Sequence, residues 1–390
     1  MPAGALPRFL LVYAALYAGY GLTTPFLPAL LSERGLSPTE VGLVLAAGTA
    51  IRLAAGPLAG GIADRLRAGR GVLAACGLLA GSSALLYLAG HGLSGLLLAS
   101  LAHAAATAPL APLADALALP AAAASRFAYG TVRGAGSAAF IAGTLAAGQV
   151  TGFVGLSALP VAGAAAFVLL AAATLALPAG PTRVEAPSAG RPGLAELRVL
   201  LHAPAFRRLV AVAALVIASH AVHEAFAVIR WREAGLSPGT ASLLWAEAVA
   251  AEVLVFLVVG PRLLARLGPA GALALAAGAG ALRWSVAALT VALPALAAIQ
   301  ALHGLTFALL HLAAMQVLAR TVPPALAATA QTLYGTLGLG LATTLATLAA
   351  GPLWARLGPG AFWVMAALCA AALPLVRGLA DDGAPRRDAG

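Results

Sequence analysis

The sequence predicts an all-α integral membrane protein, with about twelve transmembrane helices in two pseudo-symmetric six-helix bundles. Three observations lead to this fold class. First, 62% of the 390 residues are hydrophobic and only 9% are charged, and the mean hydropathy is +0.96. Second, apolar runs of about 20 residues follow one another along the chain, and that length crosses a hydrocarbon core of roughly 30 Å. Third, the second half of the chain repeats motifs of the first half.

The internal repeat is clearest in the motif Gly-Leu-Ser-Pro, which occupies residues 35–38 and again residues 235–238. A second echo, Tyr-Gly-Thr, occupies residues 129–131 and 334–336, close to the same offset. In a hydrophobic chain, two parallel halves of this length are typical of secondary transporters, whose substrate site lies where the halves meet.

The apolar runs predict the individual helices in order. Glycine and proline inside several runs do not argue against helices, because neighbouring membrane helices re-satisfy the backbone groups that these residues free. The first run is too long for the apolar region of a cleavable signal peptide, so we expect it to remain as a helix. The predicted helices cover residues 8–31, 40–62, 71–90, 94–119, 133–154, 158–178, 207–231, 240–260, 270–289, 293–318, 328–351 and 360–377.

The polar stretches between these runs set the predicted domain boundaries. We expect a first bundle over 1–178, a cytoplasmic linker over 179–206, a second bundle over 207–378 and a disordered cytoplasmic tail over 379–390. Prolines and charges gather in the linker, and the tail is rich in Asp, Arg, Gly and Pro.

The basic residues predict the orientation in the membrane. The net charge is +10, and all 23 basic residues are arginines. The predicted outer loops keep only Arg34, Arg232 and Arg356, so the positive-inside rule places both termini and the linker in the cytoplasm of a bacterial-type inner (plasma) membrane. We therefore expect no nucleic-acid partner, although an anionic-lipid or RNA contact remains the alternative reading of this charge.

Two further features concern metals and cofactors. Cys76 and Cys369 are too few and too far apart for a disulfide framework or a metal cluster, so no metal site is expected. A chain without lysine cannot contain the nucleotide-binding loop G-x-x-x-x-G-K-[ST]. We expect no cofactor, and energy for transport would come from an ion gradient.

A loop motif adds a resemblance to a known family. Residues 60–70, Gly-Gly-Ile-Ala-Asp-Arg-Leu-Arg-Ala-Gly-Arg, resemble the loop signature of the major facilitator superfamily. An acid beside arginines at a helix end can latch one helix bundle to another, which makes Asp64, Arg65 and Arg70 candidate gating residues. The second copy, residues 260–268, keeps the glycine and arginines but lacks the acid. Topology-setting charge alone is the alternative interpretation.

Within the superfamily, several segments resemble the branch of the lactose permease and the phenylpropionate permease. These segments are residues 111–116, 127–133, 327–335 and 360–365. The resemblance implies that Asp115 and Arg133 occupy the positions of a substrate-binding acid and arginine, and that Phe140 stands where a tryptophan stacks on the substrate. It also implies that Arg283 and His303 match an arginine of helix 9 and a histidine of helix 10.

The chain departs from that branch at three positions. Thr306 stands where the lactose permease has a proton-carrying glutamate, three residues after the histidine. His220 and His223 stand where it has two aspartates. The resemblance therefore does not decide whether the chain recognises a sugar or whether it keeps the proton site of the lactose permease.

Ionisable residues within a bilayer helix are costly unless they face a cavity or a partner, so each is a functional candidate. His220, His223 and Glu224 share one helix face, and a histidine beside a glutamate can hold a proton near neutral pH. A structural hydrogen-bonded cluster is the alternative. Arg52 and Glu252 lie at equivalent depths in the two halves, where either can serve a substrate carboxylate or a proton, or a structural ion pair.

Aromatic residues complete the candidate site. Tyr13, Tyr17 and Tyr20 share a face of the first helix and are able to stack on a substrate ring, although tyrosines near a helix end also anchor helices at the membrane interface. Arg283 has the alternative of snorkelling to the interface. The predicted substrate-binding residues are Arg52, Tyr17, Asp115, Arg133, Phe140 and His303, and the predicted proton-coupling residues are His223, Glu224, Glu252 and Arg283.

Together these features favour a monomeric carrier that moves a small organic solute by alternating access. Three arginines lie within membrane helices, together with only a few carboxylates, and this favours proton symport of an anionic, aromatic carboxylate-like substrate. A sugar or nucleoside symporter and an efflux pump for amphipathic compounds remain alternatives. A membrane enzyme would require a constellation such as H-E-x-x-H, and a channel a repeated filter loop, and the sequence has neither.

Overall fold

The structure is a computed structural model that describes residues 5–125, 127–177 and 194–382. The described residues form helices joined by short connections and contain no β-strand. They divide into two compact units, the first within residues 1–185 and 225–246 and the second within residues 186–224 and 247–390.

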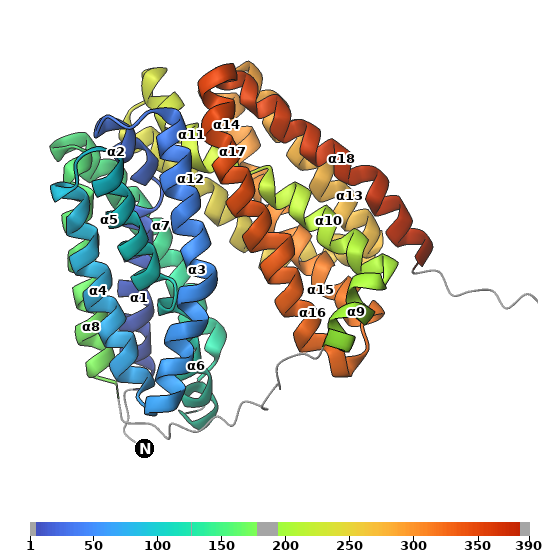
Figure 1. Ribbon diagram of the computed structural model, residues 1–390, viewed down its shortest axis with the longest axis horizontal. Helices are drawn as coiled ribbons and strands as arrows, with labels where there is room; N and C mark the ends of the chain where they lie inside the picture. Colours follow the sequence, from blue (N-terminus) through green and yellow to red (C-terminus); the bar gives the residue numbers. More distant parts are fainter. Residues whose placement is uncertain (1–4, 126, 178–193, 383–390) are drawn as a thin grey trace, which may run out of the picture. The chain divides into compact units, whose positions relative to one another are not determined.

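The first unit is built mainly from the first half of the chain. Helix α1 packs on α7 and α8, and α4 packs on α5 and α8, so that their small and apolar residues form one core (Figure 1). The bounds are α1 (Ala5–Thr23), α2 (Leu27–Glu33), α3 (Pro38–Leu66), α4 (Gly69–Ala89), α5 (Gly92–Thr107), α6 (Leu110–Ser125), α7 (Tyr129–Val154), η1 (Leu156–Ala158) and α8 (Leu159–Leu175).

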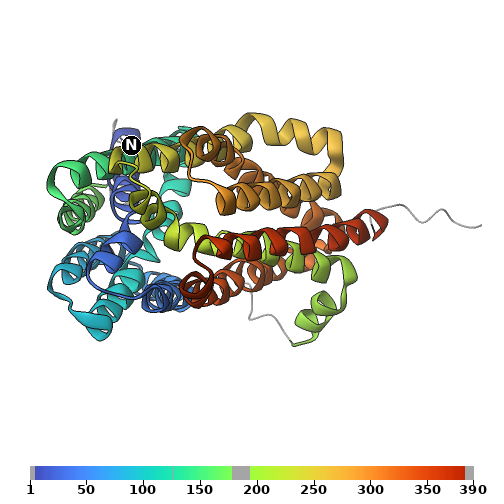
Figure 2. The same cartoon turned by 90° about the horizontal axis from the view of Figure 1, so that it is seen from above.

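In the second unit, α18 packs along both α10 and α13, and α13 also packs on α15 (Figure 2). Residues 225–233 of α11 and the beginning of α12 belong to the first unit. The bounds are α9 (Leu194–His202), α10 (Pro204–Ala218), α11 (Ala221–Glu233), α12 (Pro238–Leu254), η2 (Val255–Val259), α13 (Gly260–Leu289), α14 (Leu293–Ala301), η3 (Leu305–Leu309), α15 (Leu310–Thr321), η4 (Pro324–Leu326), α16 (Ala327–Leu333), η5 (Tyr334–Leu341), α17 (Ala342–Leu357), η6 (Gly358–Gly360) and α18 (Ala361–Asp382).

The lengths of these helices fit a membrane protein. In the described part of the chain, 10 helical stretches are long and apolar enough to cross a bilayer, and two of them, of 52 and 56 residues, are long enough to cross twice. Positive φ angles at Gly268 and Gly358 interrupt these two stretches. The twelve predicted runs all fall on these helices, which confirms the predicted fold class.

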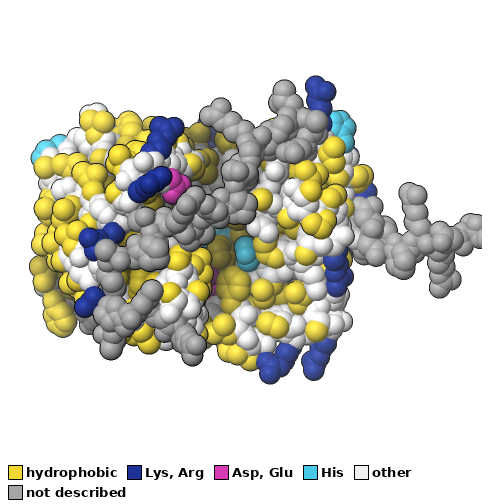
Figure 3. Space-filling model, turned by 90° about the horizontal axis from the view of Figure 1, so that it is seen from below, with side chains coloured by type: hydrophobic (Ala, Val, Ile, Leu, Met, Phe, Trp, Pro, Cys, Tyr) yellow, Lys and Arg dark blue, Asp and Glu magenta, His cyan; other side chains and the backbone are white. Residues whose placement is uncertain are grey.

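The surface is also that of a membrane protein. Leucines such as Leu58, Leu79 and Leu98 are more than half exposed. On the face drawn in Figure 3, hydrophobic side chains predominate and the arginines form a few separate groups. An apolar surface of this extent requires lipid rather than water around it.

The repeated motif folds into the same turn twice. Gly35 and Gly235 have φ angles of 88° and 84°, a region that glycine enters freely. In each turn the next leucine donates its N–H to a carbonyl five residues earlier, at 3.2 Å for Leu36 and 2.9 Å for Leu236. The turns also lie close together, because Glu33 and Arg232 form an ion pair of 3.3 Å within the first unit.

Several spans are less regular than the apolar runs predict. The first, fourth, seventh and tenth spans are interrupted by turns at residues 24–26, 108–109, 219–220 and 302. The second unit also contains three π-helical segments, η2, η3 and η5, whereas the described residues of the first unit contain none. Interrupted helices and π segments are both frequent at functional sites of membrane proteins.

Parts of the predicted linker and tail are helical. Residues 194–202 of the predicted linker form α9, and residues 379–382 of the predicted tail continue α18. The remainder of the predicted tail, and residues 179–193 of the predicted linker, lie outside the described residues.

Candidate functional site

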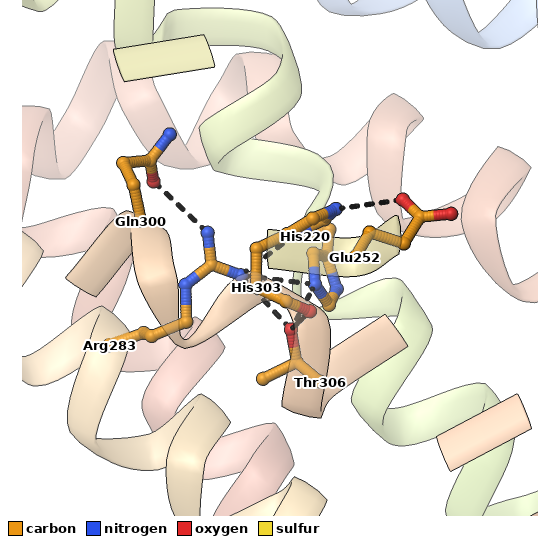
Figure 4. A network of polar contacts seen from close by, with 6 residues as sticks. All are labelled: His220, Glu252, Arg283, Gln300, His303 and Thr306. Atoms are coloured by element: carbon orange, nitrogen blue, oxygen red, sulfur yellow. Dashed lines mark hydrogen bonds and ion pairs between the residues drawn. The ribbon is translucent and has the colours of Figure 1, made fainter. Parts of the chain in front are cut away.

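Polar side chains of the membrane-spanning helices gather in two groups. The tyrosine cluster belongs to the first unit and consists of Tyr13, Tyr17, Asp115 and Arg133. The arginine network belongs to the second unit and consists of His220, Glu252, Arg283, Gln300, His303 and Thr306 (Figure 4).

The tyrosine cluster joins three helices. From α1, Tyr13 donates its hydroxyl to Asp115 Oδ1 of α6 at 2.5 Å, and Tyr17 accepts a hydrogen bond from Arg133 of α7. The Arg133 guanidinium also lies 3.7 Å from Asp115 Oδ1 and 5.2 Å from the centre of the Tyr17 ring. Asp115 and Arg133 therefore form an ion pair, and each of them also bonds to a tyrosine of α1.

A glycine makes this arrangement possible. Gly136 lies on α7, three residues after Arg133, and a Cβ atom built on it would lie 2.7 Å from the Tyr17 ring. Only a residue without a side chain lets the ring pack so closely on α7. The phenol of Tyr17 is thereby held within reach of Arg133.

The tyrosine cluster is accessible and nearly neutral. The side chains of Arg133 and Asp115 are 43% and 31% exposed, respectively, so a solute can reach both. A carboxylate accepts hydrogen bonds and a guanidinium donates them, which suits a solute with hydroxyl or carbonyl groups. The charge of Arg133 is largely offset by Asp115.

A separate arginine contact lies deeper in the same unit. Arg52, from the middle of α3, donates to Thr107 Oγ1 at 3.0 Å. Thr107 is the last residue of α5, and its carbonyl accepts the hydroxyl of Tyr20 at 2.7 Å. The turn at 108–109 is thus held by an arginine and a tyrosine from two other helices.

The arginine network surrounds a fully buried guanidinium. Arg283 of α13 donates to Thr306 Oγ1 at 3.0 Å, His303 Nδ1 at 3.1 Å and Gln300 Oε1 at 3.1 Å, and it lies 3.4 Å from His220 Nε2 (Figure 4). All these acceptors are neutral. The guanidinium also lies over the Trp284 ring, 4.4 Å from its centre, which adds a cation–π contact.

These hydrogen bonds determine where the proton of the His303 ring lies. A guanidinium is always a donor, so Nδ1 of His303 accepts and the ring proton is on Nε2. That nitrogen lies 3.6 Å from Glu252 Oε2. Arg283 therefore turns the N–H edge of His303 towards the carboxylate, as Figure 4 shows.

Close packing brings Glu252 and His303 together. Gly304 follows His303, and a Cβ atom built on it would lie 2.4 Å from the carbonyl oxygen of Ala251, the residue before Glu252. The adjoining π segments η2 and η3 also pack on each other. The side chains of His303 and Glu252 remain 14% and 26% exposed, so the pair is not sealed.

The predicted substrate-binding and proton-coupling residues are only partly brought together. Asp115, Arg133 and Tyr17 lie in one cluster, and Arg283, His303 and Glu252 lie in the other. Phe140 stands apart, because its ring has no contact with the tyrosine cluster among the described residues and its carbonyl faces Gly21 of α1.

The side chains of the three predicted neighbours on the seventh span have different surroundings. His220 joins the arginine network, and the His223 ring packs against Trp284 with centres 5.5 Å apart. Glu224 is exposed and forms no ion pair with a described residue. His220 itself lies in the turn at residues 219–220.

Of the three predicted gating residues, only Arg70 has a hydrogen-bond partner within the described part of the chain. Asp64 and Arg65 are exposed and have no hydrogen-bond or ion-pair partner there. Arg70 instead donates to the Leu177 carbonyl at 2.7 Å, across the first unit.

Two neutral residues of the site, Gln300 and Thr107, were not predicted. Both are buried and both accept a hydrogen bond from an arginine. Their only sequence signal is a polar side chain within an apolar run, which membrane helices tolerate for packing as well.

The chain is similar to known transporters over nearly its whole length. Residues 6–365 match the family model described as MFS_1 like family. The chain is 32% identical over 362 residues to the probable 3-phenylpropionic acid transporter of Escherichia coli (strain K12), with 91% of this chain and 92% of that protein covered. It is 28% identical over 366 residues to the maltose permease of Geobacillus stearothermophilus, with 93% and 91% covered.

A solved structure with the same fold is the crystal structure of the nucleoside transporter NupG. It matches with a TM-score of 0.84 over 97% of this chain and 99% of that chain. The sequences are only 15% identical, so this likeness concerns the fold alone.

Proposed function

The chain belongs to the MFS_1 like family, and from this premise we propose that it carries an anionic, aromatic carboxylate-like solute together with protons. As a member, it is a multi-pass membrane protein and a secondary transporter rather than an enzyme. In this proposal the protein works as a monomer by alternating access, in a bacterial-type inner membrane with both termini in the cytoplasm.

One observation carries the proton-coupling part, namely the contact of 3.6 Å between Glu252 and His303. Nδ1 of His303 is occupied by Arg283, so this ring has no free lone pair for a second proton. Glu252 is partly exposed and is left as the group that takes up and releases the transported proton. His303 then presents a donor to the carboxylate whenever Glu252 is ionised.

The substrate class is supported by charge. Arg52, Arg133 and Arg283 all lie within membrane-spanning helices, and a buried or half-buried guanidinium favours a carboxylate, which it binds in a planar fork. A relative with 32% identity is described as a probable 3-phenylpropionic acid transporter. The probe that we choose is therefore 3-phenylpropionate.

Proteoliposomes with a proton gradient test this function. We expect the wild-type protein to accumulate radiolabelled 3-phenylpropionate against its gradient and to lose that accumulation when a proton carrier is added. Glu252→Gln should keep counterflow, which needs no net proton movement, and lose accumulation. Glu247→Gln, on the same helix and with no ion pair to a described residue, is the matched control and should accumulate normally.

Two results would argue against this proposal. If the wild-type protein moves none of a panel of aryl carboxylates, the substrate class is wrong. If both Glu252→Gln and Glu224→Gln still accumulate the probe, these carboxylates do not carry the proton.

A second candidate is symport of a neutral, hydroxyl-bearing solute such as a sugar. The exposed and charge-compensated pair of Asp115 and Arg133 favours it, because an acid and an arginine together bind hydroxyl groups. A relative with 28% identity is named a maltose permease. Competition of the probe by maltose and by nucleosides distinguishes the two candidates.

A further inference from the structure

Arg52 occupies the most costly position that an arginine can have in a membrane helix. It is the fifteenth of the 29 residues of α3, so it lies roughly 20 Å along the axis from either end. Its side chain is nevertheless exposed. A charged group at this depth persists only where it faces a polar cavity or a partner.

The contacts of Arg52 leave most of its guanidinium unused. Within the described residues its one hydrogen bond goes to Thr107 Oγ1, although a guanidinium has five N–H donors. Thr107 is itself fixed, since its hydroxyl lies 2.7 Å from the His103 carbonyl and its own carbonyl accepts the Tyr20 hydroxyl. One edge of Arg52 is therefore held while the rest of the fork remains open.

A comparison with the other two membrane arginines shows what is unusual. Arg133 is exposed but has Asp115 beside it, and Arg283 has only neutral partners but is fully buried. Arg52 alone of these three is both exposed and without an acidic partner among the described residues. It is thus the cation of this set that an incoming anion can both reach and neutralise.

We propose that Arg52 is the anchor for the substrate carboxylate, with Thr107 and Tyr20 as the residues that position it. This proposal rests on the proposed function and names the residue of the first unit that selects an anion over a neutral solute. Two N–H groups of the open fork donate to the two oxygens of the carboxylate, a geometry that a guanidinium offers and an ammonium does not.

The competing account is structural: Arg52 serves only to hold the helix break after Thr107. The two accounts differ in charge selectivity. A structural residue affects every ligand alike, whereas a carboxylate anchor affects an acid and leaves its neutral amide unchanged. The measurement is therefore equilibrium binding of 3-phenylpropionate and of 3-phenylpropanamide to purified protein in detergent.

We expect Arg52→Gln to weaken the binding of 3-phenylpropionate by roughly 10- to 100-fold, the loss of a hydrogen-bonded charge pair, and to leave the amide within about twofold. Arg34→Gln is the matched control, because Arg34 also donates to a neutral acceptor in the first unit. It should bind both probes as the wild-type protein does. Thr107→Val, which removes the hydroxyl that orients Arg52, should weaken the acid by a smaller factor.

Three outcomes would overturn the proposal. They are unchanged binding of the acid by Arg52→Gln, an equal loss for acid and amide, and a loss of acid binding in Arg34→Gln as large as in Arg52→Gln. If Arg52→Gln does not fold, Arg52→Lys decides instead: a lysine keeps the charge but not the fork, so acid binding should fall several-fold. Undiminished acid binding by that variant would contradict the fork.

The same assay separates this proposal from the proposed function. If the wild-type protein binds no aryl carboxylate, both fall together. If it binds and transports the acid and Arg52→Gln binds it equally well, only the anchor is wrong.

Discussion

Gly304 packs directly on Ala251, so closely that a Cβ atom on the glycine would lie 2.4 Å from the alanine carbonyl oxygen. Each residue is adjacent in sequence to one partner of the Glu252 and His303 pair. The distance between the two helix backbones therefore controls whether His303 reaches the carboxylate.

Gly304→Ala should accordingly separate the helices and uncouple transport. Because a backbone oxygen has to move, we expect a loss of about 1–3 kcal/mol in stability, seen as a lower melting temperature. Accumulation of substrate should fall more than counterflow. Gly278→Ala is the control, because a Cβ atom there meets nothing within 4 Å. Equal melting temperatures of the two variants would contradict the close packing.

Arg133→Lys should weaken an acid and its amide by similar factors, roughly 3- to 10-fold, because Asp115 already offsets the charge of Arg133. Asp115→Asn leaves that charge exposed and should shift the preference towards the acid. Equilibrium binding of both probes to each variant measures these changes. Unaltered affinities with only a changed transport rate would instead make the two residues part of a gate.

Asp64→Asn tests the predicted latch. Asp64 and Arg65 are exposed near the end of α3, so their contribution to the conformational equilibrium is expected to be small. We expect labelling of engineered cysteines to show a shift of up to about fivefold between inward-open and outward-open states, with substrate binding retained. Glu233→Gln, which also removes an exposed acid, should not show it. Identical labelling of both variants would leave the loop as topology-setting charge.

The orientation of the chain is tested by a reporter. A phosphatase fused after Gly390 should be inactive, because we expect the C-terminus in the cytoplasm, where that enzyme does not fold. A green fluorescent protein at the same place should fluoresce. The reverse pattern would contradict the orientation inferred from the arginines.

The sequence predicted the fold well because length, hydropathy and internal repetition act over many residues. The turns that interrupt the spans were harder to predict from the sequence. Pro25 and Pro109 lie at two of the four turns, but the turn at 219–220 contains no proline or glycine. The π segments have no sequence pattern of their own, and they depend on how neighbouring helices pack.

The sequence predicted the charged residues of the site but not their partners. Charged residues in apolar runs are conspicuous, so Arg283 and Glu252 were found from sequence, but their partners depend on which helices approach. The contact of Glu252 with His303 joins residues 51 positions apart and follows from the packing of Gly304. His220 and Glu224 are joined by a backbone hydrogen bond of 2.9 Å, but one side chain is buried and the other exposed, and this difference follows from packing that helical periodicity does not encode.

The π segments bear on the history of the duplicated chain. Gly35 and Gly235 are 200 positions apart, but Tyr129 and Tyr334 are 205 apart, so the second copy is five residues longer than the first between these markers. A π turn closes its hydrogen bond over five residues instead of four and so takes in one extra residue. The offset is still 200 at Gly60 and Gly260, so the extra residues follow Gly260, where the π segment at 305–309 takes in one of the five. An insertion in a regular helix would rotate every later side chain by about 100°. The π turn confines that rotation to a single turn, and the second copy could therefore lengthen beside His303 while its remaining helix faces kept their original neighbours.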